Sequence, residues 1–244
     1  MPEKQSLPSI SVIICTLNEE RCLPHVLMRI PDYVSEIVLV DGRSTDRTVD
    51  VARKFRPDIR VVYQDGTGRG NALLCGIRSA SQDYCLFLDG DGSQKPEDLD
   101  RLVAVARQGY DVVKASRYLL GGGSQDETLT RRLCIWLACR IANLLWGTHF
   151  TDVAYGLCLA RREALLALDL HAQGFDFEWE LAAKAARKGF RIAEVPCTEA
   201  ARLAGESKLS VLRHGWPIAM RVFAEFWDRL RIRGSSAKDT GPSL

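Results

Sequence analysis

The sequence has no marked excess of charge, no paired cysteine motif and no long apolar run. Its 244 residues carry 33 Lys and Arg against 31 Asp and Glu, and this balance does not favour general nucleic-acid binding. The eight cysteines form no C-x-x-C pair, so zinc and disulfide frameworks are disfavoured and reduced thiols are expected. No apolar run reaches the roughly 20 residues that cross a bilayer, and the first residues lack a signal-peptide layout. We therefore expect a cytoplasmic protein with no nucleic-acid partner.

The first half of the chain alternates patterns typical of strands with patterns typical of helices. Expected strands are residues 9–15, 36–40, 60–63, 84–88 and 111–115, and expected helices are residues 44–55, 71–81 and 96–108. Strands that alternate with helices of this length predict an α/β fold with a mostly parallel sheet covered on both faces. Ligands of such sheets bind beyond the carboxyl ends of the strands.

The second half is richer in helix. Expected helices are residues 131–146, 175–188 and 210–233, the last interrupted or restarted at Pro217, and expected strands are residues 153–160 and 190–195. We interpret residues 1–234 as one domain, with a nucleotide-binding half at about 9–118 and an acceptor half at about 119–233. Residues 235–244 have the composition of a disordered tail.

Two carboxylates follow the apolar strand at residues 84–88. In extended backbone, residues i and i+2 point the same way, so Asp89 and Asp91 can converge on one cation. Carboxylate oxygens suit Mg²⁺ or Mn²⁺, which share their coordination shell with substrate phosphates. From this segment alone, an ordinary turn after a strand is an equal alternative.

Six segments in order resemble family 2 glycosyltransferases of the GT-A fold, within them the polyprenyl-phosphate branch typified by dolichol-phosphate mannose synthase. The segments are SVIICTLNEE at 11–20, EIVLVDGRSTD at 36–46, GRGNAL at 68–73, DGD at 89–91, TDVAYG at 151–156 and GESKL at 205–209. The resemblance implies a GT-A sheet with acceptor-side helices at the C-terminal end. It also implies transfer of a hexose, with inversion at the anomeric carbon, from a nucleotide diphosphate sugar of the GDP-mannose or UDP-glucose type.

The resemblance assigns the donor nucleotide to the loops after the first three strands. Thr16, Asn18 and Glu19 would hold the base and ribose, and Asp41 would contact the base. Glu19 could instead be a carboxylate that is stabilised by a helix N-terminus. Asp41 could instead be a turn residue before a glycine. Gly68 and Arg69 would lie near the diphosphate, where a helix N-terminus and a guanidinium both favour anions; these residues are matched by Gly-Lys in relatives.

The resemblance also favours the metal interpretation of the first carboxylate pair. Asp89 and Asp91 would hold Mg²⁺ or Mn²⁺ and stabilise the departing nucleotide as catalytic residues. Relatives of the polyprenyl-phosphate branch often carry Gln two residues after the second Asp. This chain has Ser93 there, followed by Gln94, so Ser93 is the candidate for a third ligand.

Four further residues match motifs near the acceptor and the phosphates. Arg117 could contact phosphate, or be a surface arginine. Asp152 would lie near the acceptor and is the candidate general base, or else a turn residue. Arg202 and Lys208 could bind the donor diphosphate or an acceptor phosphate, or form solvated charges.

The acceptor remains open between a polyprenyl phosphate and a glycan hydroxyl. A phosphate monoester is largely dianionic at neutral pH and needs no general base, whereas a hydroxyl does. The helices at 131–146 and after Pro217 are amphipathic and carry Trp, Phe and Arg, as helices at a membrane interface do. The same pattern also fits core packing or a homodimer face. A sugar nucleotidyltransferase is disfavoured because the first loop lacks its Gly-rich, basic signature, and a non-catalytic scaffold is the remaining alternative.

Overall fold

A seven-stranded sheet with the order β3-β2-β1-β4-β7-β5-β8 forms the centre of the computed structural model, which describes residues 8–125, 127–203 and 211–236. The strands are β1 (Ile10–Thr16), β2 (Glu36–Asp41), β3 (Arg60–Tyr63), β4 (Tyr84–Asp89), β5 (Val112–Ser116), β7 (Cys158–Arg161) and β8 (Ile192–Pro196). All pairings are parallel except those of β7, which runs antiparallel to β4 and β5. The predicted α/β fold with a mostly parallel sheet is confirmed.

The strand order reverses direction at β1. The chain moves outward from β1 to β2 and β3, then returns to place β4 on the other side of β1. Thr16 is in register with Asp41 on one side, and Cys15 is in register with Asp89 on the other. In open α/β sheets the crevice at such a reversal is the usual ligand site. The ends of β1, β2 and β4 therefore bring the predicted donor residues to one edge.

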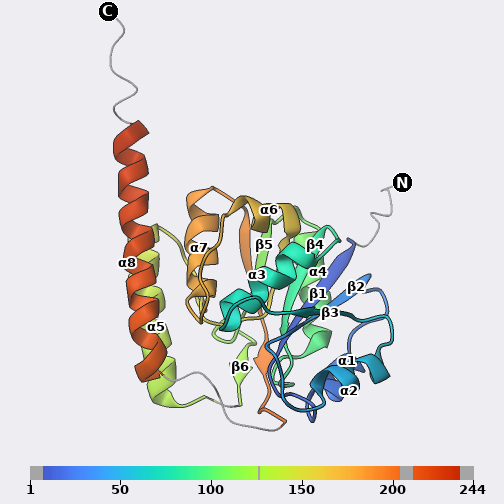
Figure 1. Ribbon diagram of the computed structural model, residues 1–244. Coiled ribbons are helices and arrows are strands. Elements are labelled where there is room, and N and C mark those ends of the chain that lie inside the picture. The colour runs from blue at the N-terminus through green and yellow to red at the C-terminus, as the bar shows by residue number, and fades with distance from the viewer. Residues whose placement is uncertain (1–7, 126, 204–210, 237–244) are drawn as a thin grey trace, which may run out of the picture.

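Helices cover both faces of the sheet (Figure 1). One face is packed by α1 (Leu23–Leu27), α2 (Thr48–Phe55) and α4 (Leu99–Ala106), and the other by α3 (Arg69–Ser79), α6 (Arg162–Ala167) and α7 (Phe177–Arg187). The alternation of side chains along β1 divides its residues between the two cores: Val12 and Ile14 belong to one and Ile13 to the other. This double burial explains why the central strands are continuous apolar runs.

Two long helices form a further layer outside α7. The helix α5 (Leu129–Trp146) and the helix α8 (Val211–Ser236) stand side by side at the left edge of Figure 1, and α8 packs on both α5 and α7. A third core joins them, in which the rings of Trp146 and Trp179 meet edge to face. No helix within the described ranges is long and apolar enough to span a membrane.

The structure corrects several sequence-based boundaries. The predicted strand at 153–160 is shorter, since only Cys158–Arg161 is extended. The helix α8 runs through Pro217 without a break and continues to Ser236, past the predicted start of the tail at 235. Proline has no amide hydrogen, so α8 loses one helical hydrogen bond there and is continued by its packing on α5 and α7.

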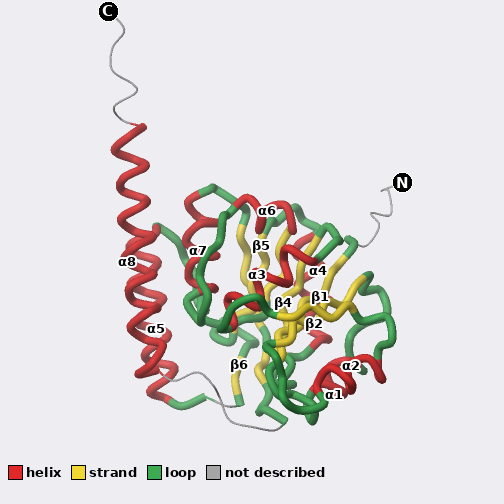
Figure 2. Tube along the Cα trace, in the orientation of Figure 1, coloured by secondary structure: helices red, strands yellow, loops and turns green. Residues whose placement is uncertain are grey.

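Four short elements were not predicted. These are α1, α6 and the two strands of a separate small sheet, β6 (Gly123–Ser124) and β9 (Thr198–Glu199), and β6 lies outside the main sheet in Figure 2. Elements of two to six residues carry too few periodic positions to stand out in a sequence.

Candidate functional site

The turn after β4 presents the two predicted metal-binding carboxylates. The backbone amide of Asp89 donates to Gln94 Oε1 and the Gln94 amide group donates back to Asp89 Oδ2, both at 2.9 Å. Asp91 Oδ1 accepts from the backbone N–H of Ser93 at 2.9 Å and from its hydroxyl at 2.7 Å. These bonds set the carboxylates in fixed orientations before any ligand arrives. The Ser93 hydroxyl, the predicted third ligand, lies beside Asp91.

A buried arginine neutralises the first carboxylate. Arg69, the first residue of α3, places Nε 3.0 Å and Nη2 2.9 Å from Asp89 Oδ1, and its Nη1 pairs with Glu178 from the first turn of α7. Burial raises the pKa of the Asp89 carboxyl above its usual value, and the charge of Arg69 opposes that rise. Burial disfavours the charged Arg69, but Asp89 and Glu178 raise its pKa, so the guanidinium stays charged.

The position of Arg69 depends on a glycine from the second half of the chain. A Cβ atom on Gly156 would lie 2.2 Å from Arg69 Nη2, so no other residue leaves room for the guanidinium as it stands. Gly156 closes the TDVAYG segment, and its contact with Arg69 gives that motif a physical reason that the sequence alone did not reveal.

A second arginine pairs with the second carboxylate. Arg202 Nη1 lies 2.7 Å from Asp91 Oδ2. The segment that carries Arg202 crosses the turn, because the backbone N–H of Ala200 donates to the Ser93 carbonyl at 2.9 Å. Arg202 therefore lies against the carboxylate turn, and its contact with a phosphate stays a prediction. Lys208, predicted alongside it, lies outside the described residues.

The start of α3 is closed by another part of the chain. Gly68 has φ +92°, and a Cβ there would lie 2.3 Å from the Gln173 carbonyl oxygen. The backbone N–H of Asn71 donates to that same oxygen at 3.1 Å. The backbone N–H groups at this helix N-terminus are expected to be available to an anion, but that of Asn71 already donates to the Gln173 carbonyl. Arg69 then supplies the positive charge beside the carboxylate turn.

The predicted nucleoside-binding residues gather at the ends of β1 and β2. Asp41 accepts hydrogen bonds from the backbone and hydroxyl of Ser44 at 2.8 and 2.6 Å, and lies 3.4 Å from Thr16 Oγ1. Asn18 takes the left-handed conformation at φ 59° and its Oδ1 accepts from the Thr45 N–H at 2.8 Å. The loop after β1 is thus tied to the loop after β2. The backbone N–H of Glu19, the other predicted residue, donates to Thr48 Oγ1 at 2.8 Å. We call this junction between the loops after β1 and β2 the seam.

Arg117 and Asp152 form a closed ion pair within the protein. Arg117 Nε and Nη2 donate to the two oxygens of Asp152 at 2.7 and 3.0 Å, and Nη1 donates to Glu199 at 3.0 Å. The side chains of Arg117 and Asp152 are 1% and 0% exposed. This pair joins the end of β5 to the TDVAYG segment and to β9. Both carboxylate oxygens accept from Arg117, so Asp152 could act as a base only if the pair opened.

Two residues at the site were given no role from the sequence. Gln94 accepts a hydrogen bond from the Asp89 backbone and donates one to the Asp89 carboxylate, and Glu199 accepts from Arg117. Neither carries a pattern of its own in the sequence. Gln94 stands one position beyond the place where relatives carry Gln, and that offset was the one available signal.

The residues at the turn suit a divalent cation that completes its shell elsewhere. Asp89 and Asp91 offer carboxylate oxygens, and Ser93 adds a hydroxyl oxygen. Among the residues that the structure describes, no group of three or more His, Cys, Asp or Glu side chains could hold a metal ion. Two carboxylates with the remaining positions left to phosphate and water is the common arrangement for Mg²⁺.

Comparison with known proteins agrees with this geometry. The family model of glycosyl transferase family 2 matches residues 11–168. The chain is 32% identical to an undecaprenyl-phosphate mannosyltransferase of Micrococcus luteus over 92% of this chain and 98% of that protein. It is 32% identical to a polyprenol monophosphomannose synthase of Mycolicibacterium smegmatis over 82% of this chain and 80% of that one.

A solved structure confirms the fold. The glucosyl-3-phosphoglycerate synthase of Mycobacterium tuberculosis, solved with Mn²⁺, UDP-glucose and phosphoglyceric acid, superposes with a TM-score of 0.71 at 24% identity, covering 91% of this chain and 79% of that one. The resemblance to the polyprenyl-phosphate branch and the GT-A fold is confirmed. The family model matches more than half of the chain, so the chain belongs to glycosyl transferase family 2 and is a glycosyltransferase.

Proposed function

We propose that this glycosyltransferase moves a hexose, with inversion, from a nucleotide diphosphate sugar of the GDP-mannose or UDP-glucose type to a polyprenyl phosphate. The observation that carries the proposal is the carboxylate turn at the point where the strand order reverses. There Asp89 pairs with Arg69, and Asp91 pairs with Arg202. Two relatives that match 92% and 82% of the chain are an undecaprenyl-phosphate mannosyltransferase and a polyprenol monophosphomannose synthase, which supports this choice of acceptor.

In the proposed mechanism, Asp89 and Asp91 hold Mg²⁺ or Mn²⁺. When bound, the cation neutralises the diphosphate and stabilises the departing nucleotide as a Lewis acid. Arg69 pairs with Asp89 through Oδ1, and Arg202 pairs with Asp91 through Oδ2. Both guanidinium groups therefore lie beside the carboxylate turn, where they would add positive charge next to a bound diphosphate.

The donor nucleoside lies in the seam between the loops after β1 and β2. Thr16, Asn18, Glu19 and Asp41 line this seam, and Gly68 lies where α3 begins, beside Arg69. The internal hydrogen bonds of Asn18 and Asp41 hold the seam in shape without a ligand, which lowers the entropy lost on binding.

The proposed acceptor requires no general base. A polyprenyl phosphate is largely dianionic at neutral pH, so its oxygen can attack the anomeric carbon directly. This fits the closed Arg117–Asp152 pair, in which both Asp152 oxygens are occupied. A glycan hydroxyl would need a base, and Asp152 would have to leave Arg117 to supply it.

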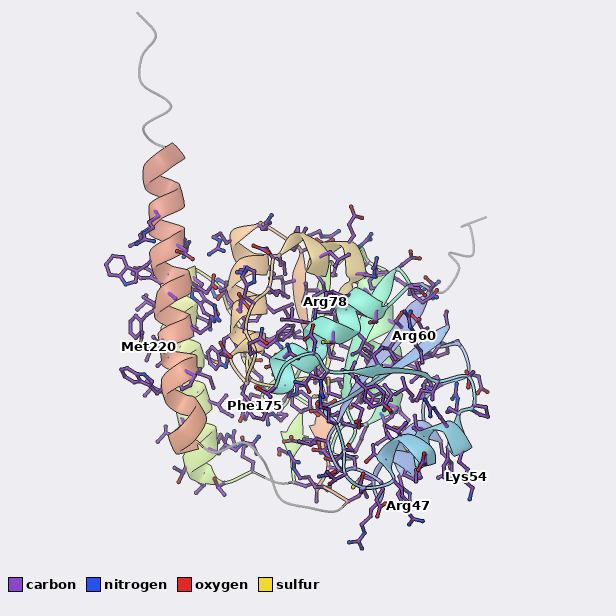
Figure 3. All side chains as sticks on the ribbon, in the orientation of Figure 1. Arg47, Lys54, Arg60, Arg78, Phe175 and Met220 are labelled. Atoms are coloured by element: carbon purple, nitrogen blue, oxygen red, sulfur yellow. The ribbon has the colours of Figure 1, made fainter. Side chains whose placement is uncertain are left out.

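The helices α5 and α8 would place the enzyme at a membrane. Exposed apolar side chains run along both: Leu133, Trp136, Leu137 and Leu144 on α5, and Trp216, Met220, Phe223 and Trp227 on α8. Figure 3 shows Met220 on the outer side of α8, away from the sheet. Arg140 and Arg231 accompany them, as expected for an interfacial helix facing anionic lipid. We propose peripheral binding at the inner face of the cytoplasmic membrane, with a homodimer as the competing use of this face.

The test is a transfer assay with labelled UDP- and GDP-sugars, vesicles containing undecaprenyl phosphate, and Mg²⁺ or Mn²⁺. The expected result is label in the organic phase with one donor class, lost on addition of a chelator. Label that stays in the aqueous phase on a glycan would contradict the lipid acceptor. Nucleotide binding without hydrolysis or transfer would instead establish a non-catalytic scaffold.

A further inference from the structure

An apolar cavity of about 230 Å³ lies between α5, α7 and α8, apart from the carboxylate turn. Its lining includes Ile135 and Ala138 from α5, Trp179 from α7, and Ile218, Ala219 and Phe223 from α8. Phe223 is 49% exposed, so the cavity opens toward the outer face of the helix pair. Protein interiors are normally packed without voids of this size.

Small side chains leave this space. Ala138, Ala154, Ala219 and Gly215 all line it, while the large residues of the third core pack beside it. An enclosed cavity of about 150 Å³ with such a lining admits benzene, so this open apolar space suits apolar molecules. The space here is larger and could hold one or two branched five-carbon units.

One basic residue also lines the cavity. Arg131 sits in the first turn of α5, and its Nε atom is buried with no hydrogen-bond partner among the residues that the structure describes. A buried donor in this state is unfavourable until an acceptor arrives. An apolar space with a cation in its lining is complementary to a hydrocarbon chain that ends in an anion.

From this combination we propose that the cavity binds the isoprene units nearest the phosphate of the acceptor lipid. The inference rests on the proposed function, since it takes the acceptor to be a polyprenyl phosphate. It adds that α5, α7 and α8 recognise the branched chain itself, so that the helix pair selects the acceptor as well as facing the bilayer. Straight-chain phosphates should fit the cavity less well than prenyl phosphates.

The first test uses direct binding without vesicles, with farnesyl phosphate as the probe. Ala219→Phe and, separately, Ala138→Leu fill the space, and both should weaken farnesyl phosphate binding on the order of tenfold, because each buried methylene adds a few-fold to a binding constant. Ala224→Phe, on an exposed position of α8, is the matched control and should bind like the wild type. Nucleotide binding should be unchanged in all three.

A second measurement needs no variant. Of the eight cysteines only Cys134 is exposed, and it lines the cavity. Farnesyl phosphate should slow its reaction with a maleimide, while inorganic phosphate should not, and dodecyl phosphate should do so less. Equal protection by dodecyl phosphate would overturn the preference for a branched chain.

The outcomes separate this inference from the proposed function. Wild-type transfer to undecaprenyl phosphate together with normal farnesyl phosphate binding by Ala219→Phe and Ala138→Leu would overturn the cavity assignment alone. Farnesyl phosphate binding that depends on the cavity, without transfer to any polyprenyl phosphate, would support the cavity and overturn the proposed reaction. Unprotected Cys134 at saturating farnesyl phosphate would also overturn the cavity assignment.

Discussion

The sheet edge and the outer helix pair, α5 and α8, differ in which kinds of side chain they bury and which they expose. At the sheet edge, charged groups are paired and at least partly buried: Arg69 pairs with Asp89 and Glu178, and the fully buried Arg117 pairs with Asp152. On α5 and α8, large apolar groups are exposed, with Leu144 at 83%, Trp216 at 73% and Trp227 at 60%. The pairing offsets the desolvation cost of the buried charges, whereas large exposed apolar groups typically mark an interaction surface.

The contrast indicates two different partners. Paired charges around a carboxylate turn suit a compact, highly charged ligand that can exchange with them. Exposed aromatic and aliphatic groups suit an extended apolar surface. A nucleotide sugar and a lipid acceptor have these two characters. Under the proposed function, donor and acceptor binding are divided between two regions that can be altered separately.

The largest effect is expected from breaking the buried Arg117–Asp152 pair at the sheet edge. Arg117→Met should destabilise the protein by about 3–5 kcal/mol, because it leaves Asp152 buried without its partner. Thermal unfolding is the measurement. Arg29→Met is the control, since the Arg29–Glu97 pair is 40% and 57% exposed and such pairs contribute about 0–1 kcal/mol. Equal shifts in the two variants would contradict the distinction.

The next largest effect is expected from a substitution in the carboxylate turn. Asp91→Asn should reduce transfer by roughly 10²–10³-fold, the scale of losing one preorganised electrostatic contact to the transition state, with little change in the melting temperature. The readout is steady-state transfer at saturating Mn²⁺. Asp50→Asn, an exposed position on α2, should have no effect. Retained turnover in Asp91→Asn would remove Asp91 from metal binding.

A smaller and pH-dependent effect is expected at Glu180. It is buried, yet its pKa lies below the usual 4.5, because hydrogen bonds from Lys184 and from the Ala172 and His171 backbones outweigh desolvation. A lowered pKa stabilises the fold above pH 4.5, and this stabilisation disappears as pH falls through the folded-state pKa.

Glu180→Gln should therefore lower stability at pH 7 by about 1–3 kcal/mol and weaken the loss of stability on acidification. Urea unfolding at pH 7 and in steps below pH 4.5 measures both. A constant difference between variant and wild type at every pH would show that the carboxylate charge is not responsible.

The smallest effect is expected on the outer face. Trp227→Gln should weaken binding to anionic vesicles by about 1 kcal/mol, because the ring is already partly covered and only its exposed part gains from the bilayer. Vesicle sedimentation measures this. Leu166→Gln, exposed on α6, is the control. A concentration-dependent dimer lost in Trp227→Gln, with vesicle binding unaffected, would assign this face to a second copy.

Sequence reasoning grouped the predicted donor residues at one sheet edge because their signals are local. The strand ends at Asp41 and Asp89 follow apolar runs, and parallel topology requires such ends to meet at one edge. The same reasoning could not find the Gly156–Arg69 contact or the Arg117–Asp152 pair. Those depend on where β5 and β7 fall in the sheet, which no local pattern specifies.

Side-chain burial was also beyond the sequence. Arg117 could be a surface residue or a phosphate ligand by pattern, and only the packing of β9 and the TDVAYG segment encloses it. The cavity beside Ala219 results from three helices that meet in space, and its small residues look like ordinary helix formers in the chain.

The most direct test compares two acceptors in one transfer assay. The variants are Asp91→Asn and the double variant Trp216→Gln/Trp227→Gln, and the acceptors are water-soluble farnesyl phosphate and undecaprenyl phosphate in vesicles. The account predicts that Asp91→Asn loses transfer to both, whereas the double variant loses transfer to vesicles and keeps transfer to farnesyl phosphate. Equal losses on both acceptors for the double variant would contradict the separation of donor and acceptor binding.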